Sequence, residues 1–141
     1  MDKPQIISIT ISFVKETLKG AEGGHDWFHI ERVYKNALLI AKSEDVDEFI
    51  VSLGALLHDI ADAKFYDGDE TIGPKIAREF LENQQVDESV IVDIEKIINF
   101  ISFKSKNGII FLSLLFHQAN AAHLFHYTHD ESDFAKDKLL F

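Results

Sequence analysis

Apolar residues recur along most of the chain at intervals of three and four positions, the spacing of one face of an α-helix. Residues 5–19 carry the first such stripe, with Ile7, Ile11, Val14 and Leu18 on one side. Similar stripes predict further helices at about residues 27–42, 45–60, 72–84 and 88–103. Nothing before residue 104 has the strict alternation of a β-strand. The pattern predicts an all-α fold, a compact bundle of about five to seven helices with short connections.

Helix-boundary residues support these limits. Gly20 follows the first predicted helix, and Asp26 is placed to cap the amino end of the second. Asp45 and Glu48 have the spacing of a capping box at the start of the third helix. Pro74 falls in the first turn of the fourth helix, where proline is tolerated.

Composition narrows the class of protein. The chain has 141 residues, enough for a single domain over residues 1–141. With no cysteine it has neither disulfides nor Cys-based zinc sites, which fits a reducing compartment. The net charge of −10 argues against a nucleic-acid polymer or an anionic membrane as partner. No secretory signal or membrane span is recognisable, so we expect a cytoplasmic protein.

Residues capable of metal chemistry gather in two segments, 24–33 and 53–65. His29 lies one turn into the second predicted helix, on the side that faces the interior. His58 and Asp59 are adjacent at the end of the apolar third helix. An imidazole and a carboxylate side by side suit a divalent metal of intermediate hardness. Asp62 would project from the same side if helical geometry continued beyond Asp59.

Structural interpretations compete with a metal site. A single buried histidine is more often a hydrogen-bonded core residue than a ligand. Asp26 is explained well enough as a helix cap. Asp59 could be an accident of sequence at a helix carboxyl end, although an acid there opposes the helix dipole and therefore requires a reason. Two inward histidines and an inward aspartate on neighbouring helices make a metal site about as plausible as the structural interpretation.

Four motifs occur in order over about three-quarters of the chain. They are GHDWFHIERV at 24–33, LLHDIAD at 56–62, GDETIGP at 68–74 and ISFK at 101–104. This ordered set resembles the HD-domain metal-dependent phosphohydrolases, and most closely small bacterial members described as nucleoside triphosphate pyrophosphohydrolases. The resemblance covers about residues 1–104 and implies the helical HD-domain scaffold.

The resemblance also implies a divalent metal, with Mn, Mg, Fe, Zn and Ni as candidates. His29, His58 and Asp59 match three of the four ligand positions. Asp62 matches the acidic position that in related enzymes orients or deprotonates the attacking water. The implied substrate is a small phosphorylated molecule, with a nucleotide as the first candidate.

Three cations are placed by the resemblance near substrate phosphate. Arg32 and Lys64 join Asp62 as catalytic candidates, and Lys104 is a substrate-binding candidate from the fifth helix. Their structural alternatives are that Arg32 pairs with a neighbouring acid and that both lysines are solvated.

The remaining candidates belong to the opening motif and to the loop before the fourth helix. His25 and Asp26 are implied to line the substrate mouth or to surround the ligands. Asp69 and Glu70 shape the loop in the structural interpretation.

Residues 105–141 depart from the family pattern. The family's fourth ligand is an aspartate in a later helix, and no such motif can be aligned here, so this segment is divergent or truncated relative to the family. Asp130 and Asp133 are candidates by residue type alone, and an imidazole could substitute for them. The imidazoles available for that substitution are those of His117, His123 and His126.

Two classes of function follow. The chain is either an active phosphohydrolase, or a catalytically degenerate HD-domain scaffold that serves as a binding or assembly module. Residues 109–116 contain seven apolar side chains and one serine. We expect them to form a helix packed on the bundle or on a second copy of the chain, which makes a homodimer a candidate assembly.

Overall fold

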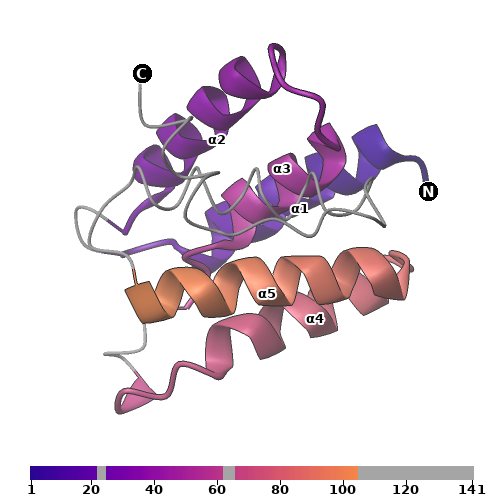
Figure 1. The fold of residues 1–141 in the computed structure, drawn as a ribbon. Coiled ribbons are helices and arrows are strands. Elements are labelled where there is room, and N and C mark those ends of the chain that lie inside the picture. Colours follow the sequence, from indigo (N-terminus) through magenta and orange to yellow (C-terminus); the bar gives the residue numbers. More distant parts are fainter. Residues whose placement is uncertain (22–24, 62–65, 105–141) are drawn as a thin grey trace.

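The computed structural model describes residues 1–21, 25–61 and 66–104, with only the backbone described beyond residue 100. These residues form five α-helices and no strand (Figure 1). The helices are α1 Lys3–Thr17, α2 Trp27–Ala41, α3 Glu48–Leu57, α4 Ile72–Asn83 and α5 Glu88–Lys104. The predicted all-α fold is confirmed.

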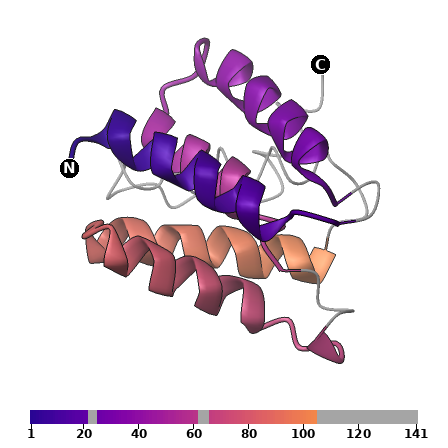
Figure 2. The same ribbon diagram turned by 180° about the vertical axis from the view of Figure 1, so that it is seen from behind.

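Helix α3 forms the centre of the bundle. Its residues from Phe49 to Leu57 are all buried, as expected for a helix that is apolar on every side. Helices α1, α2 and α5 each pack against it, and α4 packs on α5. Figures 1 and 2, seen from opposite sides, show α4 and α5 as an antiparallel pair below the other three helices.

The core is built from large aliphatic side chains that several helices contribute. The largest that are fully buried are Val14, Ile30, Ile50, Leu53, Leu56, Leu57, Leu81, Ile91, Ile94, Ile97 and Ile98. Each such side chain stabilises the fold by roughly 1.5–3 kcal/mol relative to an exposed one. Ile30 near the start of α2 and Leu56 and Leu57 at the end of α3 belong to this core, so packing fixes both of these helix ends.

The prediction that the third helix starts at Asp45 was wrong by three residues. Asp47 is the N-cap instead, and its carboxylate accepts a hydrogen bond from the backbone N–H of Phe49 at 2.9 Å. Val46, the residue before the cap, packs against the core and sets the angle at which the chain enters α3. The helix also ends at Leu57, earlier than the predicted Ile60.

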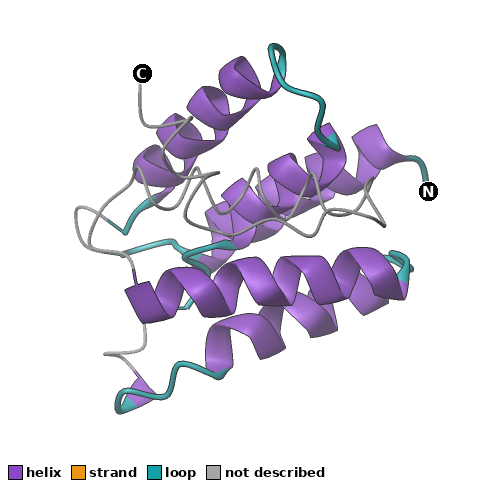
Figure 3. Ribbon diagram, in the orientation of Figure 1, coloured by secondary structure: helices purple, strands orange, loops and turns teal. Residues whose placement is uncertain are grey.

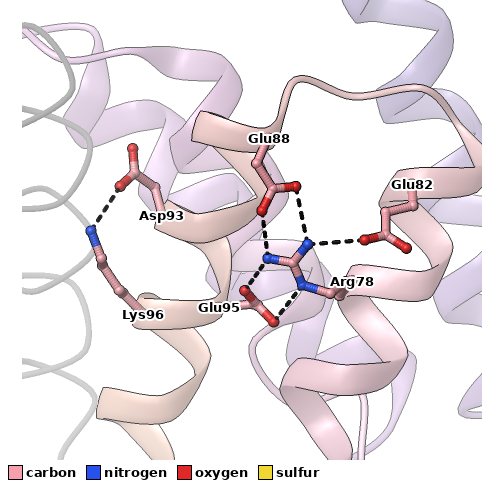
Figure 4. A network of polar contacts seen from close by, with 6 residues as sticks. All are labelled: Arg78, Glu82, Glu88, Asp93, Glu95 and Lys96. Carbon is pink, nitrogen blue, oxygen red and sulfur yellow. Dashed lines mark hydrogen bonds and ion pairs between the residues drawn. The ribbon is translucent and has the colours of Figure 1, made fainter.

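Helices α4 and α5 are fastened by a cluster of charges around Arg78 (Figure 4). The Arg78 guanidinium donates two hydrogen bonds to Glu88, at 2.9 and 3.0 Å, and two to Glu95, at 2.6 and 2.9 Å. It also contacts Glu82 one turn along α4, at 2.9 Å. Paired N–H···O bonds of this kind fix orientation as well as distance. The cluster thus sets how α5 lies on α4.

The connection between α2 and α3 is short, spanning residues 42–47, and appears as a loop at the top of Figure 3. Helices joined by so few residues pack as antiparallel neighbours. The first turn of α2 therefore lies beside the last turn of α3. This arrangement brings residues 25–29 to residues 57–59, although about thirty positions separate them in the sequence.

No helix within the described part of the chain is long and apolar enough to cross a membrane. The helix predicted at residues 109–116 lies outside the described residues.

Candidate metal centre

His29, His58 and Asp59 converge where the start of α2 meets the end of α3. The ligand atoms that these three side chains offer all lie within 4.8 Å of one another. The rings of His29 and His58 have centroids 5.6 Å apart and meet edge to face at 63°. Among the residues that the structure describes, this is the cluster able to hold a metal ion.

His29 is positioned by the cap of α2. Asp26 has an extended backbone, and its carboxylate accepts a hydrogen bond from the backbone N–H of His29 at 3.0 Å. This bond satisfies one of the unpaired donors at the helix start and fixes the turn that carries the His29 ring. The cap predicted for Asp26 is confirmed.

His58 closes the carboxyl end of α3. Its backbone N–H donates to the carbonyl of Gly54 at 3.0 Å, and its ring Nδ1 donates to the carbonyl of Ala55 at 2.8 Å. Since a carbonyl can only accept, Nδ1 carries the proton, and in the neutral ring Nε2 then holds the lone pair. Metal-ligating histidines characteristically donate their other ring nitrogen to a carbonyl or carboxylate in this way.

The electrostatic surroundings of His58 favour the neutral ring. The residue is 9% exposed, and burial lowers the pKa of its imidazole from the ordinary 6.5. The Asp59 carboxylate and the Ala55 hydrogen bond act in the opposite direction, while His29 and His25 lower it further. A metal ion binds the neutral form of imidazole, so the shift suits a ligand.

Asp59 follows the end of α3 and is held from outside the helix. The Nδ1 atom of His25 lies 2.8 Å from Asp59 Oδ2, and because a carboxylate accepts, the imidazole donates. The side chains of His25 and Asp59 are 43% and 23% exposed, respectively. Asp59 therefore has a hydrogen-bond partner in the segment before α2.

The donor set fits a divalent transition metal. Two imidazoles and one carboxylate are ligands that Zn, Fe and Mn accept, and they leave coordination positions for water or substrate. Neighbouring ligands on such an ion are about 3 Å apart, from bond lengths of about 2.1 Å. The donor atoms of the three side chains lie within 4.8 Å of one another, somewhat wider than this spacing.

The structure does not bring every predicted residue to this centre. Arg32 is exposed on α2, and it has no ion-pair partner within the described residues. Asp62 and Lys64 lie outside those residues, and only the backbone of Lys104 is described, at the end of α5. Helix α3 ends at Leu57 and residues 58–61 are not helical, so the position of Asp62 relative to Asp59 stays a prediction.

The loop before α4 agrees with its structural interpretation at Asp69. The Asp69 carboxylate accepts hydrogen bonds from the backbone N–H and the hydroxyl of Thr71, at 2.9 and 2.6 Å. These bonds lower the pKa of Asp69 and shape the turn into α4. Glu70 is exposed in this loop.

Sequence reasoning missed the specific contact between His25 and Asp59. The two residues are 34 positions apart, so no local spacing links them. The short loop between the two helices indicated only that they are antiparallel neighbours, which brings the segment before α2 to the same end of the pair as the segment after α3.

Comparison with known proteins agrees with this geometry. Residues 27–132 match the model of the family described as "HD domain". A stretch of 56 residues is 41% identical to the uncharacterized protein YpgQ of Bacillus subtilis (strain 168), covering 40% of this chain and 27% of that relative. No solved structure matches the chain. The family match covers well over half of the sequence, and the chain belongs to the HD domain family.

Proposed function

We propose that the chain is a metal-dependent phosphohydrolase that acts on a small phosphorylated molecule, with a nucleotide as the first candidate, in the cytoplasm. The observation that carries this proposal is the convergence of His29, His58 and Asp59 in a chain of the HD domain family. HD domains are generally metal-dependent hydrolases, and these residues supply donors of the required kind.

A divalent metal bound by these three residues would polarise a phosphoryl oxygen and lower the pKa of bound water towards neutrality. The chain's own groups supply the rest of the chemistry. Asp26 and the Ala55 carbonyl hold His29 and His58 in place through the hydrogen bonds described above. Three protein donors leave room for both a water molecule and a substrate oxygen, as catalytic sites require.

Proton transfer and charge neutralisation are assigned to residues beyond the three donors. We assign Asp62 to accept a proton from the attacking water. We assign the neutralisation of the negative charge that develops on phosphate to Arg32, Lys64 and Lys104. A bound metal also explains how a chain of net charge −10 attracts an anionic substrate, because one divalent ion can reverse the local field.

A fourth ligand is proposed to come from the segment after residue 104. The family match extends to residue 132, so Asp130 lies inside the matched range and Asp133 lies just outside it. The matched range therefore favours Asp130 over Asp133 as the candidate for the fourth ligand. The same segment is proposed to contact a second copy of the chain, since residues 109–116 are strongly apolar.

The test is a hydrolysis screen. Purified protein loaded with Mn²⁺ is incubated with nucleoside mono-, di- and triphosphates, and released phosphate and pyrophosphate are measured. We expect turnover of at least one nucleotide and roughly a hundredfold loss in Asp62→Asn with metal retained, the usual scale for removing a positioned base. Lys35→Ala, which alters only an exposed ion pair on α2, is the control.

Two results would contradict the proposal. Loss of metal in Asp62→Asn would make that residue a ligand instead of a base. Metal-loaded wild-type protein that turns over none of these nucleotides would favour the degenerate scaffold, whose role is binding or assembly.

A further inference from the structure

The three candidate ligands of the metal centre are held in position by different kinds of hydrogen bond. His29 is held through its backbone by the Asp26 cap, and His58 is held through its ring by a carbonyl of its own helix. Asp59 lies past the end of α3, where no helical hydrogen bond orients its side chain. Its side chain is contacted by another segment of the chain, through the hydrogen bond from His25.

Short carboxylate side chains outside a helix can rotate about two bonds. Restraining that rotation before a metal arrives lowers the entropic cost of binding. The 2.8 Å contact from His25 Nδ1 restrains Asp59 at one oxygen, while the ligand atom of Asp59 lies within 4.8 Å of those of His29 and His58. His25 is thus placed to orient the carboxylate without offering itself as a fourth donor of that cluster.

We propose that His25 is a positioning residue whose hydrogen bond to Asp59 holds this carboxylate in the orientation that completes the metal centre. This inference rests on the metal site of the proposed function and goes beyond it, because it concerns metal affinity and not hydrolysis. Of the two roles that the resemblance implies for His25, it favours a position around the ligands over one at the substrate mouth.

The proposed role of His25 depends on a hydrogen-bond donor at the position of Nδ1. The variants test the contribution of this donor independently of the contribution of the ring. His25→Asn keeps an N–H donor at a position similar to Nδ1, whereas His25→Phe keeps a ring and removes the donor. His25→Ala removes both. Lys35→Ala, an exposed position about two turns from the start of α2, is the matched control.

The experiment measures the Kd for Mn²⁺ alone, from the EPR signal of free Mn²⁺, at one fixed pH and without substrate. We expect His25→Phe and His25→Ala to bind roughly 10- to 100-fold more weakly, the usual effect of removing a partner of a metal ligand. His25→Asn should remain within a few-fold of wild type, and Lys35→Ala should be unchanged. The metal-free melting temperatures of all four variants should stay close to that of wild type.

The outcomes distinguish this inference from the proposed function. Wild-type affinity in His25→Phe, or equal loss of affinity in His25→Phe and His25→Asn, overturns the positioning role and leaves the metal site intact. If the metal-free melting temperature falls in parallel with the metal affinity across the three His25 variants, the positioning role is overturned in favour of a structural role. A wild-type chain that binds no Mn²⁺ overturns both. Failure of the hydrolysis screen leaves the affinity series and its conclusion unaffected.

Discussion

At the scale of single residues, the candidate site depends on hydrogen bonds that also complete helix ends. Asp26 caps α2 and fixes the turn bearing His29, while His58 caps α3 through its backbone and its ring. The structural interpretation of these residues and their metal-binding interpretation are therefore not exclusive. A histidine whose Nδ1 donates to a carbonyl satisfies a helix end and presents Nε2 for coordination in the same conformation.

Asp26→Ala tests the cap. Loss of its carboxylate leaves the His29 N–H without its acceptor, so the free energy of unfolding should fall by roughly 0.5–2 kcal/mol. Urea denaturation of the metal-free protein measures this. Asp26→Asn, which retains a side-chain oxygen, should differ from wild type by much less. Equal stability of Asp26→Ala and wild type would contradict the assigned cap.

The sequence predicted the local roles of these residues but not their contacts with other helices, for physical reasons. The Asp26 cap and the inward direction of His29 follow from local spacing, which helical geometry fixes within a turn. The contact between His25 and Asp59 depends on how two helices pack, which no local pattern specifies. The start of the third helix was misplaced because Asp45 and Asp47 are both good caps, and the packing of Val46 favours Asp47.

At the scale of helices, α3 orients the site and the α4–α5 pair supports α3 from below (Figure 1). The apolar periodicity predicted every described helix to within about three residues at each end, because buried faces repeat with the helical period. It gave no indication of the Arg78 cluster, whose partners Glu88 and Glu95 lie on another helix.

Arg78→Ala tests the cluster that joins α4 to α5. We expect the melting temperature to fall by a few degrees at neutral pH, on the order of the effect of a multi-partner ion network. Lys96→Ala, which removes a single exposed contact to Asp93 at 3.6 Å, is the control and should have little effect (Figure 4).

Acidification should narrow the difference in melting temperature between wild type and Arg78→Ala. The Arg78 hydrogen bonds lower the pKa of Glu88 in the folded chain from the ordinary 4.5. A carboxylate with a depressed folded pKa contributes stability above its unfolded pKa and loses it as the pH falls through the folded one. The difference between the two melting temperatures should therefore begin to narrow as the pH falls below about 4.5, and it should keep narrowing until the pH has passed the lowered folded pKa of Glu88. A difference that is constant from neutral to acidic pH would contradict this account.

At the scale of the whole molecule, an all-α bundle brings two helix ends together to form one candidate metal centre. The short connection from α2 to α3 makes them antiparallel, the buried α3 fixes their packing, and the caps orient the side chains. The resemblance seen in the sequence predicted three candidate ligands, and the structure places their donor atoms within 4.8 Å of one another. The fourth ligand stays a prediction, because its candidates lie outside the described residues.

The central claim is that His29, His58 and Asp59 together hold one divalent ion. The most direct measurement is the metal-to-protein ratio from elemental analysis of wild type and His58→Ala, purified side by side without chelator or nickel. We predict about one ion per wild-type chain and almost none in His58→Ala, because removing one of three donors leaves a set too small for a stable site. Wild-type occupancy in His58→Ala would contradict the site.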